Sequence, residues 1–160
     1  MKQIFWGIDL GGTKIEAVVL EMGTEPKVEV LSRLRVPTEA KQGYAHVLGQ
    51  IQKVIQLTIE ETGITPKKVG IGTPGTLDPQ TQTLKNSNTL CLNGQAVQKD
   101  LEDLLKIPVQ IANDANCFAL AEARLGAVPQ ALPTAQVVFG VIMGTGVGGG
   151  LVVDGKVIQG

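Results

Sequence analysis

The chain has 160 residues, 43% of them hydrophobic, and a formal net charge of -1 from 14 basic and 15 acidic residues. This length allows one sizeable core and part of a second, and the balanced charge gives no electrostatic reason to bind nucleic acid or an anionic membrane surface. No stretch reaches the roughly 20 apolar residues of a membrane helix, and Cys91 and Cys117 lack the spacing of a zinc site or a disulfide framework. We therefore expect a cytoplasmic protein that binds small molecules.

The first third of the chain predicts a meander followed by a helix. Three strands joined by glycine turns are expected at Gln3–Asp9, Lys14–Leu20 and Lys27–Val36. From Tyr44 to Thr58 apolar residues recur at intervals of three and four, which predicts an amphipathic helix that stops at Gly63. The apolar stripe of such a helix must cover a sheet.

The middle of the chain alternates strands and helices. A short strand is predicted in KVGIGTPG (68–75), a helix in VQKDLEDLLKIPV (97–109) and a buried strand in VQIA (109–112). A second helix follows in NDANCFALAEARLG (113–126), with Asn113 or Asp114 marking its start and Gly126 its end. This order predicts an α/β fold with a mixed sheet flanked by helices, in which ligands bind at the carboxyl ends of strands.

The end of the chain resembles its beginning. QVVFGVIMGTGVGGGLVVDGKVIQG (136–160) is strand, glycine turn and strand, like QIFWGIDLGGTKIEAVVL (3–20), so we interpret it as an internal repeat. We predict a first unit at 1–126, a proline-broken linker at 127–135, and at 136–160 the first β-hairpin of an incomplete second unit. The hairpin carries more apolar surface than a two-stranded ribbon can cover, which predicts dimers or aggregation.

Two glycine-rich turns, Leu10–Lys14 and Gly144–Gly150, are candidate phosphate sites. Backbone N–H groups exposed by glycines form an anion-binding concavity, although an ordinary hairpin with positive φ at Gly11 and Gly12 explains the first turn equally well. Asp9 lies beside that turn, where its carboxylate suits the water shell of a Mg²⁺ ion that bridges nucleotide phosphates. The alternative for Asp9 is to anchor the turn by hydrogen bonds.

The second turn also matches a dinucleotide-binding pattern by spacing alone. GTGVGG (144–149) fits Gly-x-Gly-x-x-Gly, but that fingerprint should open a helix, whereas Leu151, Val152 and Val153 favour a strand. A dehydrogenase half-domain is therefore an alternative that depends on whether a helix or a strand follows Gly149.

Asp114 is the candidate catalytic base. It follows a strand and begins a helix, where exposed N–H groups and the helix dipole favour the ionised carboxylate. In that position it can accept the proton of a substrate hydroxyl that attacks a γ-phosphoryl group, and its alternative role is a plain N-cap. Asn113, Asn88 and Gly75 are candidates for contacts with a polyhydroxylated substrate, and each is also explained as a turn residue.

Five motifs together resemble the ROK family of sugar kinases and repressors, in order and in spacing. They are DLGGTK (9–14), GIGTPG (70–75), NSNTLCLNG (86–94), ANDANCFALAEA (112–123) and GTGVGGG (144–150). The resemblance covers nearly the whole chain and implies the actin-like, ribonuclease H-like kinase fold, with two lobes that close on ATP and a sugar.

The resemblance also implies roles for individual residues. The first phosphate motif is matched by Asp9, Gly11, Gly12, Thr13 and Lys14, and the second by Gly144, Thr145 and Gly146. Positions that contact the sugar are matched by Asn88, Asn113 and Asp114, with Asp114 as the catalytic base.

The implied activity is ATP-dependent, Mg²⁺-assisted phosphorylation of a hexose. LNGQ (92–95) resembles fructokinases and mannokinases, whereas NDANCFALAEA (113–123) resembles N-acetylglucosamine kinases, so fructose, mannose, glucose and N-acetylhexosamines stay open. The alternative is a non-catalytic sugar-binding or regulatory member of the family. Because the chain starts directly on its first strand, without the helix-turn-helix of the repressors, we do not expect DNA binding.

The family's Glu-x-Gly-His motif and cysteine-rich zinc loop would follow Gly160. We therefore expect this chain to be a fragment that is inactive alone, with structural zinc bound only by the part beyond it. No zinc ligand and no chemical role for His46, the single histidine, are expected here.

Overall fold

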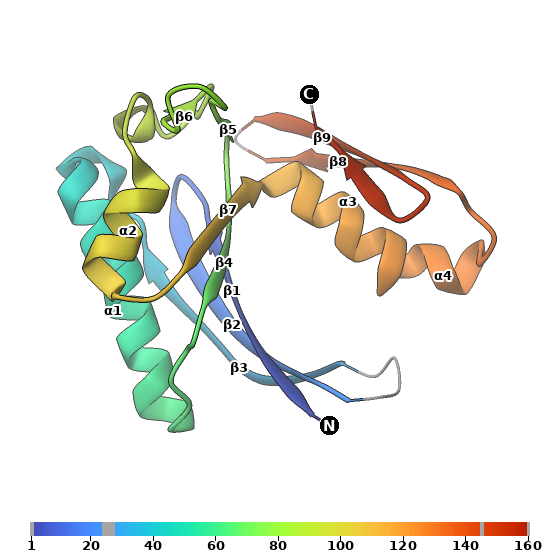
Figure 1. Ribbon diagram of the computed structural model, residues 1–160, viewed down its shortest axis with the longest axis horizontal. Helices are drawn as coiled ribbons and strands as arrows, with labels where there is room; N and C mark the ends of the chain where they lie inside the picture. Colours follow the sequence, from blue (N-terminus) through green and yellow to red (C-terminus); the bar gives the residue numbers. More distant parts are fainter. Residues whose placement is uncertain (1, 24–27, 145, 160) are drawn as a thin grey trace. The chain divides into compact units, whose positions relative to one another are not determined.

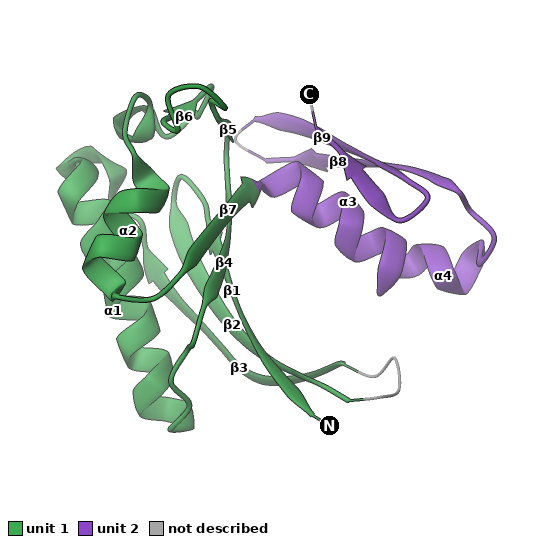
Figure 2. Ribbon diagram, viewed as in Figure 1, with its two compact units in different colours: residues 1–112 green, residues 113–160 purple. Residues whose placement is uncertain are grey.

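The structure, a computed structural model, describes residues 2–23, 28–144 and 146–159 (Figure 1). The chain divides into two units, residues 1–112 (unit 1) and residues 113–160 (unit 2) (Figure 2). Lys27, the predicted first residue of the third strand, lies outside the described residues, as does Thr145.

Unit 1 is built around a five-stranded mixed sheet of order β3-β2-β1-β4-β7. Strand β1 pairs antiparallel with β2 and parallel with β4, and β2 pairs antiparallel with β3. Its elements are β1 (Gln3–Leu10), β2 (Lys14–Met22), β3 (Val28–Pro37), α1 (Tyr44–Thr62), β4 (Val69–Thr73), β5 (Thr76–Leu77), β6 (Leu84–Lys85), α2 (Val97–Leu105) and β7 (Val109–Asn113), with short 3-10 turns at Ala40–Gln42 and Leu90–Leu92. The predicted α/β class, with a mixed sheet flanked by helices, is confirmed.

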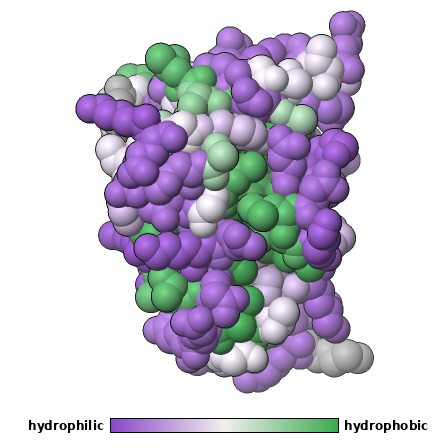
Figure 3. All heavy atoms as spheres, turned by 90° about the vertical axis from the view of Figure 1, so that its left-hand side faces the viewer, coloured by the Kyte–Doolittle hydropathy of each residue, from purple (hydrophilic) through white to green (hydrophobic). Residues whose placement is uncertain are grey.

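The core of unit 1 lies between the sheet and helices α1 and α2. On β1 the buried residues Trp6, Ile8 and Leu10 alternate with more exposed neighbours, as expected for a strand with one covered face. Helix α1 contributes a buried stripe at helical spacing (Val47, Gln50, Ile51, Val54, Ile55 and Thr58). Viewed from the side of α1 and α2, the surface is largely hydrophilic, with apolar residues in separate patches (Figure 3).

Helix α1 ends where the sequence predicts. Gly63 has φ 70°, in the left-handed region, and its N–H donates to the carbonyl of Ile59 over 2.7 Å. Glycine adopts this conformation without a steric penalty, which is why it terminates helices.

Unit 2 contains a helix packed on a three-stranded antiparallel meander of order β10-β9-β8. Its elements are α3 (Asp114–Arg124), α4 (Ala127–Ala131), β8 (Val137–Met143), β9 (Val147–Val153) and β10 (Lys156–Ile158). Because Gly149 lies within β9 and the chain continues as a strand where the dinucleotide fingerprint should open a helix, the dehydrogenase alternative is wrong.

Glycines of the hairpin make room for α3. A Cβ placed on Gly140 would lie 2.9 Å from the Cα of Ala119, and one on Gly150 would lie 2.8 Å from the carbonyl carbon of Ala115. The helix therefore approaches the sheet backbone more closely than any side chain on these two residues would allow. Helix packing therefore explains two glycines of the β8–β9 hairpin, in addition to the predicted role of its turn in phosphate binding.

Two predicted boundaries differ from the structure. The predicted first unit ends at Gly126, but α3 packs on the hairpin and the compact units divide after Ala112. The predicted linker 127–135 contains the helix α4. Among the helices of the described residues, none has the length and apolar character that crossing a membrane requires.

Candidate functional site

The Gly11–Lys14 turn joins β1 to β2 and is held by hydrogen bonds of its own backbone. The Gly11 N–H donates to the carbonyl of Lys14 over 3.0 Å, while Thr38 donates to the carbonyls of Gly11 and Thr13. Within the part of the chain that the structure describes, no hydrogen bond involves the N–H groups of Gly12 and Thr13, and both residues are exposed. Exposed backbone donors in a tight turn suit an anion such as a phosphate.

Space, and not a positive φ, explains the glycine at position 11 of this turn. Neither Gly11 nor Gly12 is among the described residues with positive φ, so that expectation is wrong. Close approach explains Gly11 instead, because a Cβ on it would lie 3.0 Å from the carbonyl oxygen of Lys14. At Gly12 a Cβ would lie 3.6 Å from Oγ1 of Thr89, in ordinary contact.

Asp9 lies two residues before the Gly11–Lys14 turn, and its role towards Mg²⁺ stays a prediction. Its exposed side chain lies near the carboxyl end of β1, opposite Glu16 on β2 and beside Gly72 on β4. One carboxylate beside the predicted phosphate turn is compatible with Mg²⁺, which keeps several waters and takes its remaining ligands from phosphate oxygens. Among the described residues, no group of three or more acidic, histidine or cysteine side chains is arranged to hold a metal ion.

The loop 86–94 presents Asn88 to solvent. Ser87 and Thr89 are only 4% and 3% exposed, whereas Asn88 between them is exposed. The side chain of Asn93 fixes this alternation, because its Oδ1 accepts from the Ser87 N–H and its Nδ2 donates to the Ser87 carbonyl, both over 2.8 Å. Ser87 Oγ in turn accepts from the Thr89 N–H over 3.1 Å.

Sequence reasoning did not single out Ser87 and Asn93. The available signal was their residue type, because Ser and Asn side chains often hydrogen-bond to nearby backbone groups in loops. The loop lies against the Gly11–Lys14 turn through Thr89, whose buried hydroxyl has no hydrogen-bond partner among the described residues. Unit 1 therefore brings the predicted phosphate turn together with the loop that carries Asn88.

Gly75 lies against the start of the same loop. It has φ 87°, and a Cβ on it would lie 2.9 Å from the Ser87 nitrogen and closer still to the carbonyl oxygen of Lys85. Glycine is required at this position for both conformation and space. Contact between Gly75 and a sugar stays a prediction.

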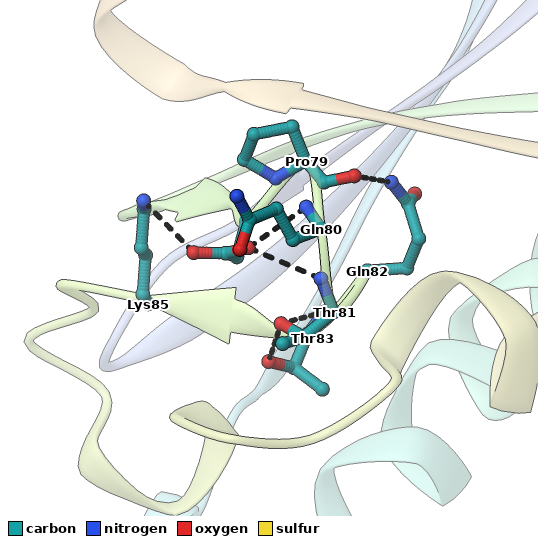
Figure 4. A network of polar contacts seen from close by, with 7 residues as sticks. Pro79, Gln80, Thr81, Gln82, Thr83 and Lys85 are labelled. Atoms are coloured by element: carbon teal, nitrogen blue, oxygen red, sulfur yellow. Dashed lines mark hydrogen bonds and ion pairs between the residues drawn. The ribbon is translucent and has the colours of Figure 1, made fainter.

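The β5–β6 hairpin connects Gly75 to this loop, and Gln80, Thr81 and Lys85 take part in its network of polar contacts (Figure 4). The carboxylate of Asp78 accepts from the N–H groups of Gln80 and Thr81 over 2.9 and 3.1 Å, and from Nζ of Lys85 over 3.1 Å. The hydrogen bonds from Thr81 and Gln80, and then the one from Lys85, lower the pKa of Asp78 from 3.8 to about 2.

The hairpin is therefore expected to loosen in acid. A lowered pKa stabilises the folded hairpin above the unfolded pKa of about 4, and this contribution is lost as the pH falls towards about 2. The protection factors of the Gln80 and Thr81 amides against hydrogen exchange, which are corrected for the intrinsic pH dependence of exchange, should fall across that window. Asp78→Asn is the matched control, since its side chain does not titrate, and an unchanged pH profile in this variant would contradict the assignment.

Asn113 and Asp114 lie at the start of α3 and have different roles there. Asn113 is the N-cap, because its side chain accepts from the Asn116 N–H over 3.2 Å. Asp114 is the first helical residue; it is half-buried, and its Oδ1 accepts from the Ala115 N–H over 2.8 Å. The plain N-cap role considered for Asp114 therefore belongs to Asn113.

The second glycine turn lies in unit 2, on the hairpin that α3 covers. The Gly144 N–H donates to the carbonyl of Gly146 over 2.8 Å. Thr145, the middle residue of the predicted phosphate motif, lies outside the described residues. Gly148 follows within the same motif, and a Cβ on it would lie 3.2 Å from Cβ of Ala115, next to Asp114. The motif therefore combines the hydrogen bond between Gly144 and Gly146 with glycines that lie against the first turn of α3.

His46 lies near the start of α1. Its Nε2 is 2.7 Å from Oε2 of Glu39, which also accepts from the side chain of Gln50 over 3.2 Å. The absence of a chemical role for His46 stays a prediction.

Comparison with known proteins gives relatives along the whole chain. An N-acetyl-D-glucosamine kinase of Aliivibrio salmonicida is 41% identical over 157 residues, which are 98% of this chain and 49% of that protein. An N-acetyl-D-glucosamine kinase of Yersinia pestis is 38% identical over 160 residues, covering 98% of this chain and 57% of the relative. The chain thus spans about half the length of the curated relatives it matches.

Solved structures show the same fold. A ROK hexokinase from Thermus thermophilus has a TM-score of 0.75 and 33% identity, over 100% of this chain and 49% of the other. A ROK family glucokinase from Streptomyces griseus, solved with glucose and AMPPNP, has a TM-score of 0.81 and 28% identity, over 99% of this chain and 47% of the other. The predicted actin-like kinase fold is confirmed. Because the ROK family profile matches residues 5–160, the chain belongs to the ROK family.

Proposed function

We propose that this chain forms the sugar- and phosphate-binding part of an ATP-dependent hexose kinase. The observation that carries the proposal is Asp114, which lies at the first position of α3 with its helix already capped by Asn113. The relatives at 38–41% identity are named as sugar kinases and supply the reaction class. Use of ATP favours the cytoplasm, the compartment that the sequence predicts.

In the proposed reaction, Asp114 accepts the proton of the sugar hydroxyl while the hydroxyl oxygen attacks the γ-phosphorus of ATP. The bond from that phosphorus to the β–γ bridging oxygen breaks, and ADP leaves. The Gly12 and Thr13 N–H groups of the first turn donate to phosphate oxygens, and the second motif, Gly144–Gly146, is the other proposed phosphate contact. Asp9 is the carboxylate that would hold the water shell of Mg²⁺, whose charge offsets that of the phosphates.

We further propose that Gly75, Asn88 and Asn113 contact the sugar and that an N-acetylhexosamine is the first substrate to test. Support for this sugar comes from the N-acetyl-D-glucosamine kinases among the relatives. Glucose and mannose follow, since the similar solved structures include a ROK family glucokinase and an inorganic polyphosphate/ATP-glucomannokinase. The similarity of LNGQ to fructokinases has no support among these relatives, so fructose ranks last.

The test is a panel of these four sugars with the complete natural protein, detecting ADP and, separately, sugar binding by calorimetry. The highest kcat/KM is expected for N-acetylglucosamine. ADP release with a different hexose would support the proposed kinase activity but contradict N-acetylglucosamine as its preferred substrate. Sugar binding without ADP release would favour the alternative of a non-catalytic, sugar-sensing member. A protein that neither binds a sugar nor releases ADP would contradict both the kinase and the sugar-sensing alternative.

We also propose that the 160-residue chain self-associates through the uncovered face of β8. On this strand Val137, Phe139, Val141 and Met143 are between 46% and 82% exposed, on the face opposite Gly140, which contacts α3. An apolar strand face of this kind favours pairing with another copy.

Phe139→Ser is expected to weaken this association by about tenfold or more, since a phenylalanine side chain contributes about 1.5–3 kcal/mol when buried. Sedimentation equilibrium measures the change. Leu132→Ser is the matched control, because Leu132 is 65% exposed, similar to Phe139 at 68%, but lies off β8. A wild-type chain that stays monomeric, or an equal effect of both variants, would contradict the proposal.

A further inference from the structure

Thr38 is a buried threonine whose two polar donors are both directed at the Gly11–Lys14 turn. It follows β3 directly and has no exposed surface. Its hydroxyl Oγ1 donates to the carbonyl of Gly11 over 2.7 Å, and its backbone N–H donates to the carbonyl of Thr13 over 3.0 Å. One residue therefore fixes two of the peptide units that make up the turn.

Fixing these carbonyls also fixes the N–H groups on the opposite side of each peptide unit. A trans peptide is planar, and its C=O and N–H point in opposite directions. The Gly11 carbonyl shares its peptide unit with the Gly12 N–H, and the Thr13 carbonyl shares its unit with the Lys14 N–H. Because both carbonyls are directed towards Thr38, both N–H groups are directed away from it.

The residues that carry these two N–H groups, Gly12 and Lys14, are exposed, in contrast to Thr38. Thr38 thus directs the Gly12 N–H away from itself, with the Lys14 ammonium on the same segment; Lys14 is the first residue of β2, and its carbonyl accepts from the Gly11 N–H. Without the Oγ1 hydrogen bond, the Gly11–Gly12 peptide unit would lose the contact that defines its direction, while the backbone bond to Thr13 would remain.

We propose that Thr38 is a positioning residue for phosphate binding: its hydroxyl orients the Gly12 N–H towards a phosphate oxygen of ATP without touching the nucleotide. This inference rests on the proposed function of the turn. Hydrogen bonds to charged groups contribute strongly to binding, so misdirecting one donor is expected to weaken ATP binding by about tenfold.

The experiment compares three variants of the complete natural protein. Thr38→Val removes the hydroxyl at nearly constant volume, and Thr38→Ser restores it. Thr58→Val is the matched control, because Thr58 is equally buried but its Oγ1 donates to the Val54 carbonyl within α1, over 2.8 Å. The readouts are the Kd and KM for ATP, the Kd for the sugar, kcat, and the melting temperature.

Thr38→Val is expected to raise the Kd and KM for ATP by about tenfold and to leave the sugar Kd within about twofold of the wild-type value. The ATP Kd and KM of Thr38→Ser and Thr58→Val should stay within about twofold of the wild-type values. ATP binding by Thr38→Val at the wild-type level would overturn the positioning role alone. A wild-type protein that binds no ATP would instead overturn the proposed function, and the role of Thr38 with it.

A second measurement needs no substitution and covers the case in which Thr38→Val does not fold. In ¹⁵N-labelled wild-type protein, ATP should shift the amide resonances of Gly12 and Lys14 more than that of Gly23, a described glycine at the other end of β2. If ATP binds but leaves the Gly12 and Lys14 amides unshifted, the inference is wrong.

Discussion

Replacing Asp114 with asparagine is expected to lower kcat for sugar phosphorylation by about 100-fold or more while changing the sugar Kd by no more than about twofold. The amide cannot accept the proton of the attacking hydroxyl. Its carbonyl oxygen can still accept the Ala115 N–H that Oδ1 of Asp114 accepts over 2.8 Å, and Asn113 still caps the helix. Single-turnover kinetics and calorimetry on the complete natural protein separate the two effects.

Asp154→Asn is the matched control for this experiment. Asp154 lies in the turn between β9 and β10 with φ 48°, and asparagine is tolerated in that conformation, so the same chemical change should leave kcat unaffected. A near-normal kcat in Asp114→Asn would remove Asp114 from the role of base. A large loss of sugar binding would indicate that its carboxylate acts mainly as a sugar ligand.

Replacing Gly75 with alanine is expected to destabilise unit 1 by about 2–4 kcal/mol. A left-handed conformation costs a non-glycine residue about 1–2 kcal/mol, and forcing an added carbon into packed surroundings costs about 1–3 kcal/mol more. Both apply here, because Gly75 has φ 87° and its added Cβ would overlap the backbone of Lys85 and Ser87. Denaturant unfolding, followed by the fluorescence of the single tryptophan, Trp6, in the core of unit 1, measures the change.

Gly94→Ala separates the two contributions. Gly94 has φ 78°, but a Cβ on it would have no neighbour within 4 Å, so only the conformational cost of about 1–2 kcal/mol is expected. Equal destabilisation by the two variants would show that the contact with Lys85 and Ser87 is unimportant. In the complete protein, Gly75→Ala should also weaken sugar binding, because the displaced segment leads directly to Asn88.

The secondary structure was predictable because the signals that define it are local. Helix α1 follows from apolar residues at helical spacing and from Gly63, and the observed helix, Tyr44–Thr62, ends at that glycine. The strands follow from short apolar runs between glycine turns, and observed strand ends differ from predicted ones by only a few residues. The mixed sheet follows from the order of these elements.

The candidate site was predictable only in part. The sequence identifies Asp9, the Gly11–Lys14 turn and Asp114 by residue type and by the motifs of a family. It offers no way to choose between Asn113 and Asp114 as the cap, since both residue types are good N-caps. The structure distinguishes them through one hydrogen bond, from the Asn116 N–H to Asn113.

By itself, the sequence determined the α/β class, the elements and the residues that belong to the family's motifs, because periodicity, turn residues and motif spacing act between neighbours in the chain. Only the tertiary structure decided the contacts between distant segments: Thr38 with Gly11, Gly75 with Ser87, and Gly150 with Ala115. It also placed α3 in unit 2, ahead of the predicted boundary. The physical reason is that hydrogen bonds and close packing between distant segments depend on how the chain folds back, and the same residue types occur in many loops without making such contacts.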